Sequence, residues 1–264
     1  MTNQFDDDFF ARMQMMVEME SEPIHQARKK LSELIDWIYQ QDWHMEQLTG
    51  FANWRKLSPE VLVKARSFMV PDDLPPSYFP KEFHDDGLGF INGSRVIFSG
   101  RYCYPVLDSK RNVAGFVGYD AFETPKYLDS FNYGYKSKTT MYYGMENIEK
   151  IYRDMSCAFV EGPVCKLRGD EADLNILSSL GSKLSPYMVT IMRRFGRGAL
   201  VLPDSDEAGD KYAKQIKYDC PQARVMRFTK ANDLDDTVKE YGPAVLEEIR
   251  DALKHPFGRY TYIK

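Results

Sequence analysis

Three short apolar runs in the C-terminal part of the chain are each followed by carboxylates. The runs with their carboxylates are Ala158–Val160 with Glu161, Ala199–Leu202 with Asp204 and Asp206, and Arg224–Phe228 with Asp233 and Asp235. If the runs are neighbouring parallel strands, their carboxyl ends meet at one edge of a sheet, where ligands usually bind. Carboxylates held that close repel one another unless a cation lies among them, and an oxygen set without His or Cys favours Mg²⁺ or Mn²⁺. The sequence therefore predicts a divalent metal site.

Each of these carboxylates taken singly has an ordinary structural explanation. Asp206 stands where a helix would follow a strand, and an aspartate there most often caps the helix by accepting amide hydrogen bonds. The order of the pieces favours a site: strand, Glu and Gly; a strand and a helix; strand and Asp-x-Asp-x-x-Gly; then another strand and an acidic cluster. Alternating strands and helices predict a parallel sheet with covering helices. Helices are expected near residues 165–172, 186–195, 207–217 and 243–253.

The preceding residues read as two further parts. Up to about residue 80 the chain is helical: apolar residues of 24–38 recur every three or four positions, and Ser58 before Pro59 marks a second helix start. The tryptophans of this part, Trp37, Trp43 and Trp54, are expected in its core. From about 88 to 145, short β-branched and aromatic segments separated by turns predict a small antiparallel sheet. Its strands are expected at 95–98, 101–107 and 113–119.

Lysines alternate with aromatic residues at the end of this β-rich part. The residues concerned are Lys126, Tyr127, Phe131, Tyr133, Tyr135, Lys136 and Lys138. Phosphates attract cations and bases stack on flat rings, so the segment suits a single strand of nucleic acid. The pattern alone is not specific, because exposed Tyr and Lys are common on any β surface.

Composition limits the class of protein. With 35 Lys and Arg against 39 Asp and Glu, the formal net charge of −4 argues against a protein that coats nucleic acid, but it permits an enzyme with a local basic groove. The four cysteines never form Cys-x-x-Cys, which argues against a zinc ribbon within this chain. The N-terminus is acidic, unlike a secretory signal, and no segment reaches the length of a membrane span. We therefore expect a cytoplasmic protein with free thiols.

The segment from Phe159 to Ile249 resembles the Toprim domain, which is shared by bacterial-type primases, type IA and type II topoisomerases, some nucleases and recombination proteins. The pieces that carry the resemblance are Phe-Val-Glu161-Gly162, Ser-Ser-Leu-Gly181-Ser182 and Val-Leu-Pro-Asp204-Ser-Asp206-Glu-Ala-Gly209. Asn232-Asp233-Leu-Asp235-Asp236 and the later Gly242-Pro243-Ala244 are similar to motifs of the primase branch. The resemblance implies a Rossmann-like parallel sheet with flanking helices.

The upstream region resembles the N-terminal subdomain of a bacterial replicative (DnaG-like) primase core, which other Toprim proteins lack. Its matching pieces are Trp54-Arg55-Lys56-Leu57-Ser58-Pro59-Glu60, Arg101-Tyr-Cys-Tyr-Pro105, Val113-Ala-Gly115-Phe-Val-Gly118, Thr124-Pro125-Lys126-Tyr127 and Tyr143-Gly144-Met145. The resemblance, over roughly residues 50 to 250, implies a mixed α+β and α/β chain: a helical region at 1–85, a β-rich subdomain at 86–155, a Toprim domain at 156–254 and a tail at 255–264. It also implies a core without zinc-binding and helicase-binding domains, as in phage-encoded primases or primase subunits acting in the host cytoplasm.

The resemblance assigns roles residue by residue. It implies Glu161, Asp204 and Asp206 as catalytic metal ligands, with Asp233 and Asp235 completing the Mg²⁺ or Mn²⁺ site. Nucleotide or DNA binding is expected at basic positions that face the template groove; these are Arg55, Arg101, Lys126, Lys136 and Lys138. The implied activity is primer synthesis by a DNA-directed RNA polymerase. Its partners would be single-stranded DNA, ribonucleoside triphosphates, a replicative helicase and a zinc-domain or other replication protein in trans. No association with a membrane is expected.

Two departures from the family pattern keep alternatives open. Tyr119 stands where the family usually has a groove arginine, and Cys165 stands where it often has an aspartate four residues after the glutamate. Nearby acid at Asp170, Glu171 or Asp173 is a candidate substitute for the missing aspartate. The alternatives are a metal-dependent Toprim nuclease, which would use the same carboxylates with water as attacking group, and a degenerate primase-like subunit of a replication complex.

Overall fold

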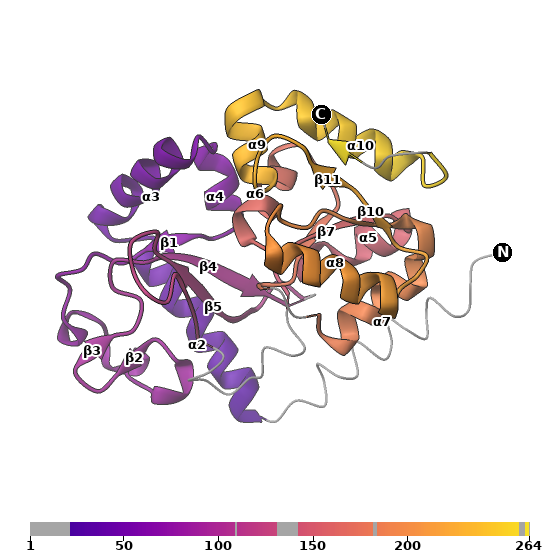
Figure 1. Cartoon of the computed structure of the whole chain (residues 1–264). Coiled ribbons are helices and arrows are strands. Elements are labelled where there is room, and N and C mark those ends of the chain that lie inside the picture. Colours follow the sequence, from indigo (N-terminus) through magenta and orange to yellow (C-terminus); the bar gives the residue numbers. More distant parts are fainter. Residues whose placement is uncertain (1–21, 109, 131–141, 182–183, 259–261, 264) are drawn as a thin grey trace.

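The computed structural model describes residues 22–108, 110–130, 142–181, 184–258 and 262–263. Two lobes lie side by side, each built on its own sheet (Figure 1). The first lobe runs from α2 to β6, and the second from α5 to β12. The predicted fold class is confirmed: N-terminal helices and an antiparallel sheet precede a parallel sheet with flanking helices.

The first lobe is an antiparallel sheet with helices on both faces. Its helices are α2 (Glu22–Ile38), α3 (Asp42–Arg55) and α4 (Pro59–Lys64); its sheet, in spatial order, is β1 (Phe68–Met69), β4 (Tyr102–Leu107), β5 (Val113–Tyr119) and β6 (Tyr127–Asp129). Three 3-10 turns, η1 (Pro76–Tyr78), η2 (Lys81–Phe83) and η3 (Asp86–Leu88), and the hairpin of β2 (Ile91–Asn92) and β3 (Arg95–Val96) join β1 to β4. The predicted boundary at residue 85 stays a prediction, but β1, which lies before it, pairs with β4.

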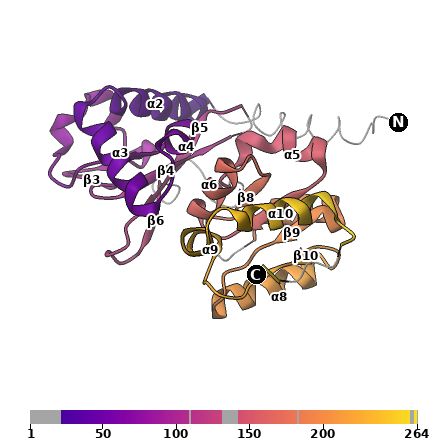
Figure 2. The ribbon, with the colours of Figure 1, turned by 90° about the horizontal axis from the view of Figure 1, so that it is seen from above.

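Alternating side chains of the sheet build two cores. Cys103 and Phe116 face α2, whereas Tyr102 and Val117 face α3 and α4. The second core also contains Leu167 of α6 (Pro163–Glu171), so a helix of the second lobe packs against the first. This shared core fixes the lobes relative to each other (Figure 2).

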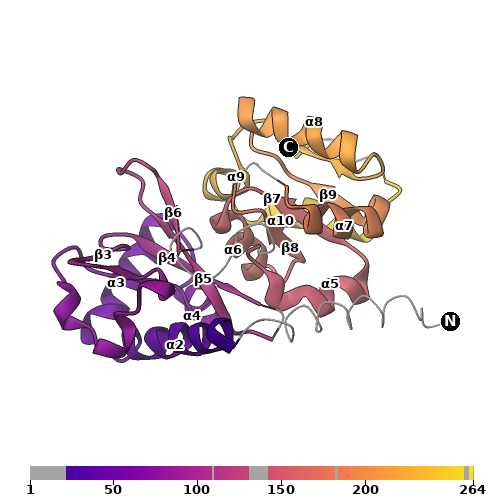
Figure 3. The same cartoon turned by 90° about the horizontal axis from the view of Figure 1, so that it is seen from below.

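The second lobe is a three-layer sandwich around the parallel sheet. In spatial order its strands are β10 (Arg224–Val225), β9 (Ala199–Val201), β7 (Cys157–Val160) and β8 (Ile176–Ser178). One face is covered by α5 (Ile148–Asp154), α7 (Pro186–Phe195) and α8 (Glu207–Asp219), the other by α6, α9 (Leu234–Tyr241) and α10 (Ala244–Lys254) (Figure 3). The remaining elements are the 3-10 turns η6 (Met145–Asn147) and η7 (Gly196–Gly198) and the parallel pair β11 (Arg227–Phe228) and β12 (Tyr262–Ile263). Burial on both faces explains why the strands read as continuous apolar runs.

One expectation for the N-terminal helical region was wrong, and one of its helices had no predicted bounds. Helix α3 was not predicted, because Gln41 at its start gives no side-chain cap and its buried face mixes His44 with apolar residues. Trp54, at the end of this helix, is 51% exposed and not a core residue. No helix in the described part of the chain is long and apolar enough to cross a membrane.

His44 makes the first lobe sensitive to acid. Its side chain is fully buried, its ring centroid lies 4.1 Å from that of Tyr39, and burial lowers its pKa to about 4. The unfolded chain therefore binds a proton between about pH 6.5 and 4 that the folded chain does not. We expect this group to lower the free energy of unfolding as pH falls through that window, by about 3 kcal/mol at pH 4.

Urea unfolding of wild type and His44→Phe at pH 7 and pH 4.5 checks this. The variant should lose less stability than wild type on acidification. His255→Gln, which removes an exposed histidine paired with Asp251, should behave as wild type. Equal acid sensitivity in wild type and His44→Phe would contradict the expectation.

Candidate functional site

Glu161 lies immediately after β7, at the carboxyl edge of the parallel sheet. Its side chain is buried, and Oε1 accepts a hydrogen bond of 3.3 Å from the backbone amide of Asp204. Burial raises the pKa of this carboxyl group, and the nearby charge of Asp206 adds to the effect. The neighbouring strands β7 and β9 therefore bring the predicted glutamate and the Asp-x-Asp turn together.

Asp204 is at the centre of the predicted cluster. It follows β9, and its pKa is raised to about 8, first by burial and then by the charges of Glu161, Asp233 and Asp206. Asp206 caps α8, since its Oδ1 accepts a hydrogen bond of 2.8 Å from the Gly209 amide. The structural explanation of Asp206 is thus correct, and capping leaves it beside the other carboxylates.

Asp233 is brought to the same edge by the segment after β11. It caps α9 by accepting a 2.8 Å hydrogen bond from the Asp236 amide, and burial raises its pKa. The Ser205 amide donates to the carbonyl of Asn232 at 2.6 Å, which ties the two acidic turns together through their backbones. The segments that carry the four carboxylates, distant in sequence, therefore meet at one sheet edge.

The chemistry of Glu161, Asp204, Asp206 and Asp233 fits a hard divalent cation. Within the described residues none of the four forms an ion pair with a lysine or arginine, and their mutual repulsion contributes to the raised pKa of Asp204. As placed, no three His, Cys, Asp or Glu side chains of the described ranges are close enough to hold one ion. Holding an ion would therefore require these side chains to turn toward one another.

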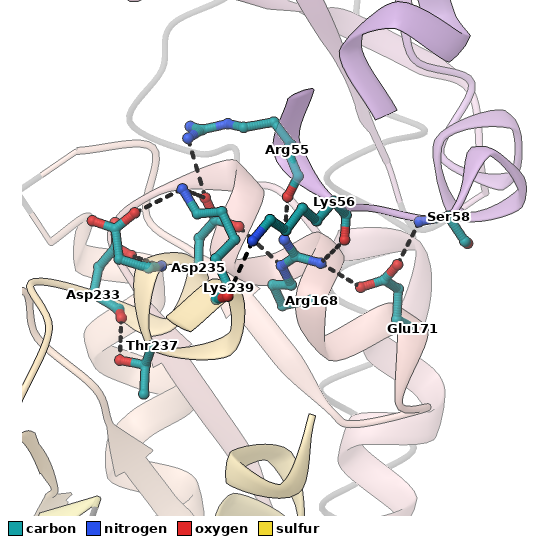
Figure 4. Close-up of polar contacts among 10 residues, drawn as sticks. Arg55, Lys56, Ser58, Arg168, Glu171, Asp233, Asp235, Thr237 and Lys239 are labelled. Atoms are coloured by element: carbon teal, nitrogen blue, oxygen red, sulfur yellow. Dashed lines mark hydrogen bonds and ion pairs between the residues drawn. The ribbon is translucent and has the colours of Figure 1, made fainter. Parts of the chain in front are cut away.

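Asp235 has different surroundings from the other four. Its side chain is 2% exposed and contacts three cations: Arg168 Nε at 2.9 Å, Lys239 Nζ at 3.1 Å and Arg55 Nη1 at 3.2 Å (Figure 4). Its charge is therefore compensated within the protein, in contrast to the charge of Asp204. The structure brings Asp235 near the predicted cluster but directs its oxygens to arginine and lysine.

A cation and aromatic surface borders the site on the first lobe. The Arg55 guanidinium carbon lies 4.8 Å from the Trp54 ring centroid and 5.1 Å from that of Tyr119, and Lys126 Nζ lies 5.4 Å from Tyr119. We call these residues, with Tyr127 beside Tyr119, the cation–aromatic face. Tyr119 stands at the position where the family usually has a groove arginine. The side chains of Arg55 and Lys126 thus supply positive charge beside it.

The remaining predicted basic residues are placed differently. Arg101 is buried, and its Nη1 donates to the carbonyls of Pro125 at 3.1 Å and Lys126 at 3.3 Å, so it holds the segment that leads into β6. Its burial does not favour the predicted contact with DNA. Lys136 and Lys138 lie outside the described residues.

Cys165 is buried in α6 beside the cluster. Burial raises the pKa of its thiol, as do the charges of Asp233 and Asp204, so it remains neutral where the family often has an aspartate. The candidate substitutes are engaged elsewhere: Asp170 with Lys166, Glu171 with Arg168, and Asp173 with Lys150. These ion pairs do not favour any of the three as a substitute for the missing aspartate.

Sequence reasoning missed Arg168 and Lys239. Lys239 follows Asp235 by four residues on one helix, a spacing that brings side chains together and could have revealed it. Arg168 lies 67 residues from Asp235 in sequence, and no local pattern marks it.

Comparisons with known proteins match this architecture. A Toprim-like family model matches residues 161–238. The DNA primase of Aquifex aeolicus is 27% identical over 164 residues, 59% of this chain and 32% of that protein, and the DNA primase of Listeria monocytogenes is 22% identical over 165 residues, 58% and 26%. The chain thus spans about a quarter to a third of the length of these relatives.

Solved structures of primase cores share the fold. The RNA polymerase domain of Mycobacterium tuberculosis primase DnaG aligns with a TM-score of 0.69 at 18% identity, covering 89% of this chain and 84% of that one. The E. coli primase catalytic core aligns with a TM-score of 0.68 at 21% identity, covering 88% and 81%. The chain therefore contains a segment, residues 161–238, that matches the Toprim-like family model, and it has the fold of a DnaG-like primase catalytic core.

Proposed function

We propose that the chain is the catalytic core of a DNA primase, a metal-dependent polymerase that joins ribonucleotides on a single-stranded DNA template. The observation that carries this proposal is one juxtaposition. Carboxylates without compensating cations lie at the edge of the parallel sheet, and the cation–aromatic face of the first lobe borders them through the contact of Arg55 with Asp235. The first feature suits a divalent cation and the second a nucleic-acid strand.

Glu161, Asp204, Asp206 and Asp233 are the proposed ligands of Mg²⁺ or Mn²⁺. When bound, one or two such ions supply charge neutralisation for the transferred phosphoryl group and lower the pKa of the primer 3′-hydroxyl. The protein contributes position: one oxygen each of Asp206 and Asp233 accepts a capping bond, and one oxygen of Glu161 accepts the Asp204 amide. The second oxygen of each would face the ion once the side chains turn toward one another. No side-chain nucleophile is required.

The test is synthesis on single-stranded DNA with four ribonucleotides and Mn²⁺, with and without a zinc-domain protein in trans. Primers support the proposal. Degradation of the template would instead indicate the Toprim nuclease, and neither product would indicate a degenerate subunit. We include a replicative helicase among the proposed partners of this chain. Co-purification of the chain with the helicase from a reconstituted mixture tests that part of the proposal.

Trp54 is the proposed stacking residue for an unpaired base. Its ring is 51% exposed, and Arg55 and Tyr119 are its neighbours in the cation–aromatic face. We expect Trp54→Ala to weaken binding of a labelled single-stranded oligonucleotide by about tenfold, since one base stacked on an aromatic ring contributes about 1–3 kcal/mol. Fluorescence anisotropy at one fixed salt concentration measures it.

Phe257→Ala is the matched control for this variant. Phe257 is also exposed and has the Arg197 guanidinium carbon 5.3 Å from its ring centroid, but it belongs to the chain after α10. Its loss should leave oligonucleotide binding unchanged. If the two alanine variants bind as well as wild type, the cation–aromatic face is not the strand-binding surface.

A further inference from the structure

Asp235 has its oxygens shared among three cations from different parts of the fold. Arg55 belongs to the first lobe, Arg168 to α6, and Lys239 to α9 itself. A carboxylate that is buried and already neutralised by charge-assisted bonds offers little to a metal ion. Its neighbour two residues earlier, Asp233, instead accepts a 2.8 Å hydrogen bond from the Asp236 amide. The two aspartates of one motif are thus in different electrostatic states.

Arg168 extends this contact to the end of helix α3. Its Nη1 donates to the carbonyl of Lys56 at 2.7 Å, and its Nη2 donates to the carbonyl of Arg55. The last carbonyls of a helix lack partners within the helix and carry partial negative charge, so a buried arginine satisfies them well. Lys56, with φ of 55°, is in the left-handed conformation that ends α3 at this point.

Glu171, one helical turn after Arg168, binds the start of the next helix. Its Oε1 accepts a hydrogen bond of 2.6 Å from the Ser58 amide, and its Oε2 accepts one of 3.0 Å from Arg168. Ser58 in turn caps α4, since its Oγ accepts from the Val61 amide at 3.2 Å. Helix α6 of the second lobe thereby holds both helix ends of the α3–α4 turn (Figure 4).

We infer that Asp235 is a positioning residue and not a metal ligand. With Arg55, Arg168 and Glu171 it forms a latch that fixes the α3–α4 turn against helices α6 and α9. Trp54 and Arg55 of the cation–aromatic face end α3 directly before this turn, and Asp233 of the carboxylate cluster caps α9. The latch therefore sets where the strand-binding surface stands relative to the metal-binding carboxylates. This inference rests on the proposed function. Its tests measure metal binding and hydrogen exchange and need no nucleotide transfer. The inference and the proposed function can therefore fail independently of each other.

Asp235→Asn keeps the shape of the side chain and removes its charge. Titration calorimetry with Mn²⁺ alone should give an affinity within about twofold of wild type, because the removed charge was already compensated. Asp204→Asn, in the same assay, should weaken Mn²⁺ binding by about tenfold or more, because the number of charged ligands sets the affinity of such sites. Hydrogen exchange of residues 56–61 should be about tenfold faster in Asp235→Asn, since the turn loses its anchor.

Asp173→Asn is the control for loss of a paired carboxylate. Its ion pair with Lys150 is 2.6 Å long but lies at the surface, and its loss should change neither measurement. If Asp235→Asn weakens Mn²⁺ binding as much as Asp204→Asn, Asp235 is a ligand and the inference is wrong. Unchanged exchange at residues 56–61 would overturn it equally.

Arg55→Gln gives a second test that keeps Asp235 intact, for use if Asp235→Asn does not fold. It removes the first lobe's cation from the latch. If Asp235 positions the turn, exchange of residues 56–61 rises about tenfold and Mn²⁺ affinity stays within about twofold. If Asp235 is a ligand, removal of a competing cation should tighten Mn²⁺ binding by about fivefold or more, which would overturn the inference.

Discussion

Replacing Asp204 by asparagine is expected to reduce primer synthesis about a thousandfold or more, because the reaction loses a charged ligand at the centre of its electrostatic site. Asp204 is the carboxylate on which the charges of Glu161, Asp206 and Asp233 converge. Asparagine has the same shape but cannot supply the negative charge that a divalent ion requires. Incorporation of labelled ribonucleotide on single-stranded DNA with Mn²⁺ measures the loss.

The same substitution should stabilise the metal-free protein. A carboxyl group whose pKa is about 8 when folded and near 4 when unfolded loses its favourable contribution as pH rises between those values. At pH 8 without metal, Asp204→Asn should therefore melt at a higher temperature than wild type. The opposite signs of the two effects separate a functional role from a folding defect.

Asp210→Asn is the control in the neighbouring helix α8. Asp210 lies in the first turn of α8, and its carboxylate is already paired with Arg227 at 2.8 Å. It should keep synthesis within about twofold of wild type, as for most surface substitutions. Full synthesis by Asp204→Asn would mean that the carboxylate cluster is not the reactive site.

Gly209→Ala should damage both stability and activity. A Cβ at this position would lie 2.0 Å from the carbonyl oxygen of Asp204 and 2.9 Å from its amide nitrogen, and backbone atoms cannot move aside as a flexible side chain would. We expect a loss of about 3 kcal/mol in the free energy of unfolding. The displaced Asp204 should lower synthesis about a hundredfold, the scale of effect expected from a misplacement of about 1 Å.

Gly50→Ala supplies the matched comparison. Gly50 is an exposed residue inside α3, and a Cβ there would meet nothing within 4 Å. The same added methyl group should raise the free energy of unfolding by about 0.5–1 kcal/mol, since alanine is favoured over glycine within helices. Urea unfolding measures the free energy of unfolding of both variants, and the synthesis assay measures their activity. Equal behaviour of the two would refute the steric argument.

The elements predicted correctly are those with local signals. Ser58 and Ser185, each before a proline, cap α4 and α7. Each hydroxyl accepts a hydrogen bond from the backbone amide three residues later. The apolar runs that became β7 and β9 were recognisable because both faces of a parallel sheet are buried. The bounds of helix α3 could not be predicted because its packing depends on residues distant in sequence. Its Phe51 ring, for example, stacks with the Tyr102 ring of β4 at a centroid distance of 3.4 Å.

For the site, the sequence by itself determined that Glu161 and Asp204 would meet, because the carboxyl ends of adjacent parallel strands share one edge. It could not distinguish Asp233 from Asp235. Residues two apart at the start of a helix point in different directions, and only packing decides what each one meets. Here α6 places Arg168 against Asp235 and leaves Asp233 with the carboxylates, so the tertiary structure gives one motif two different environments.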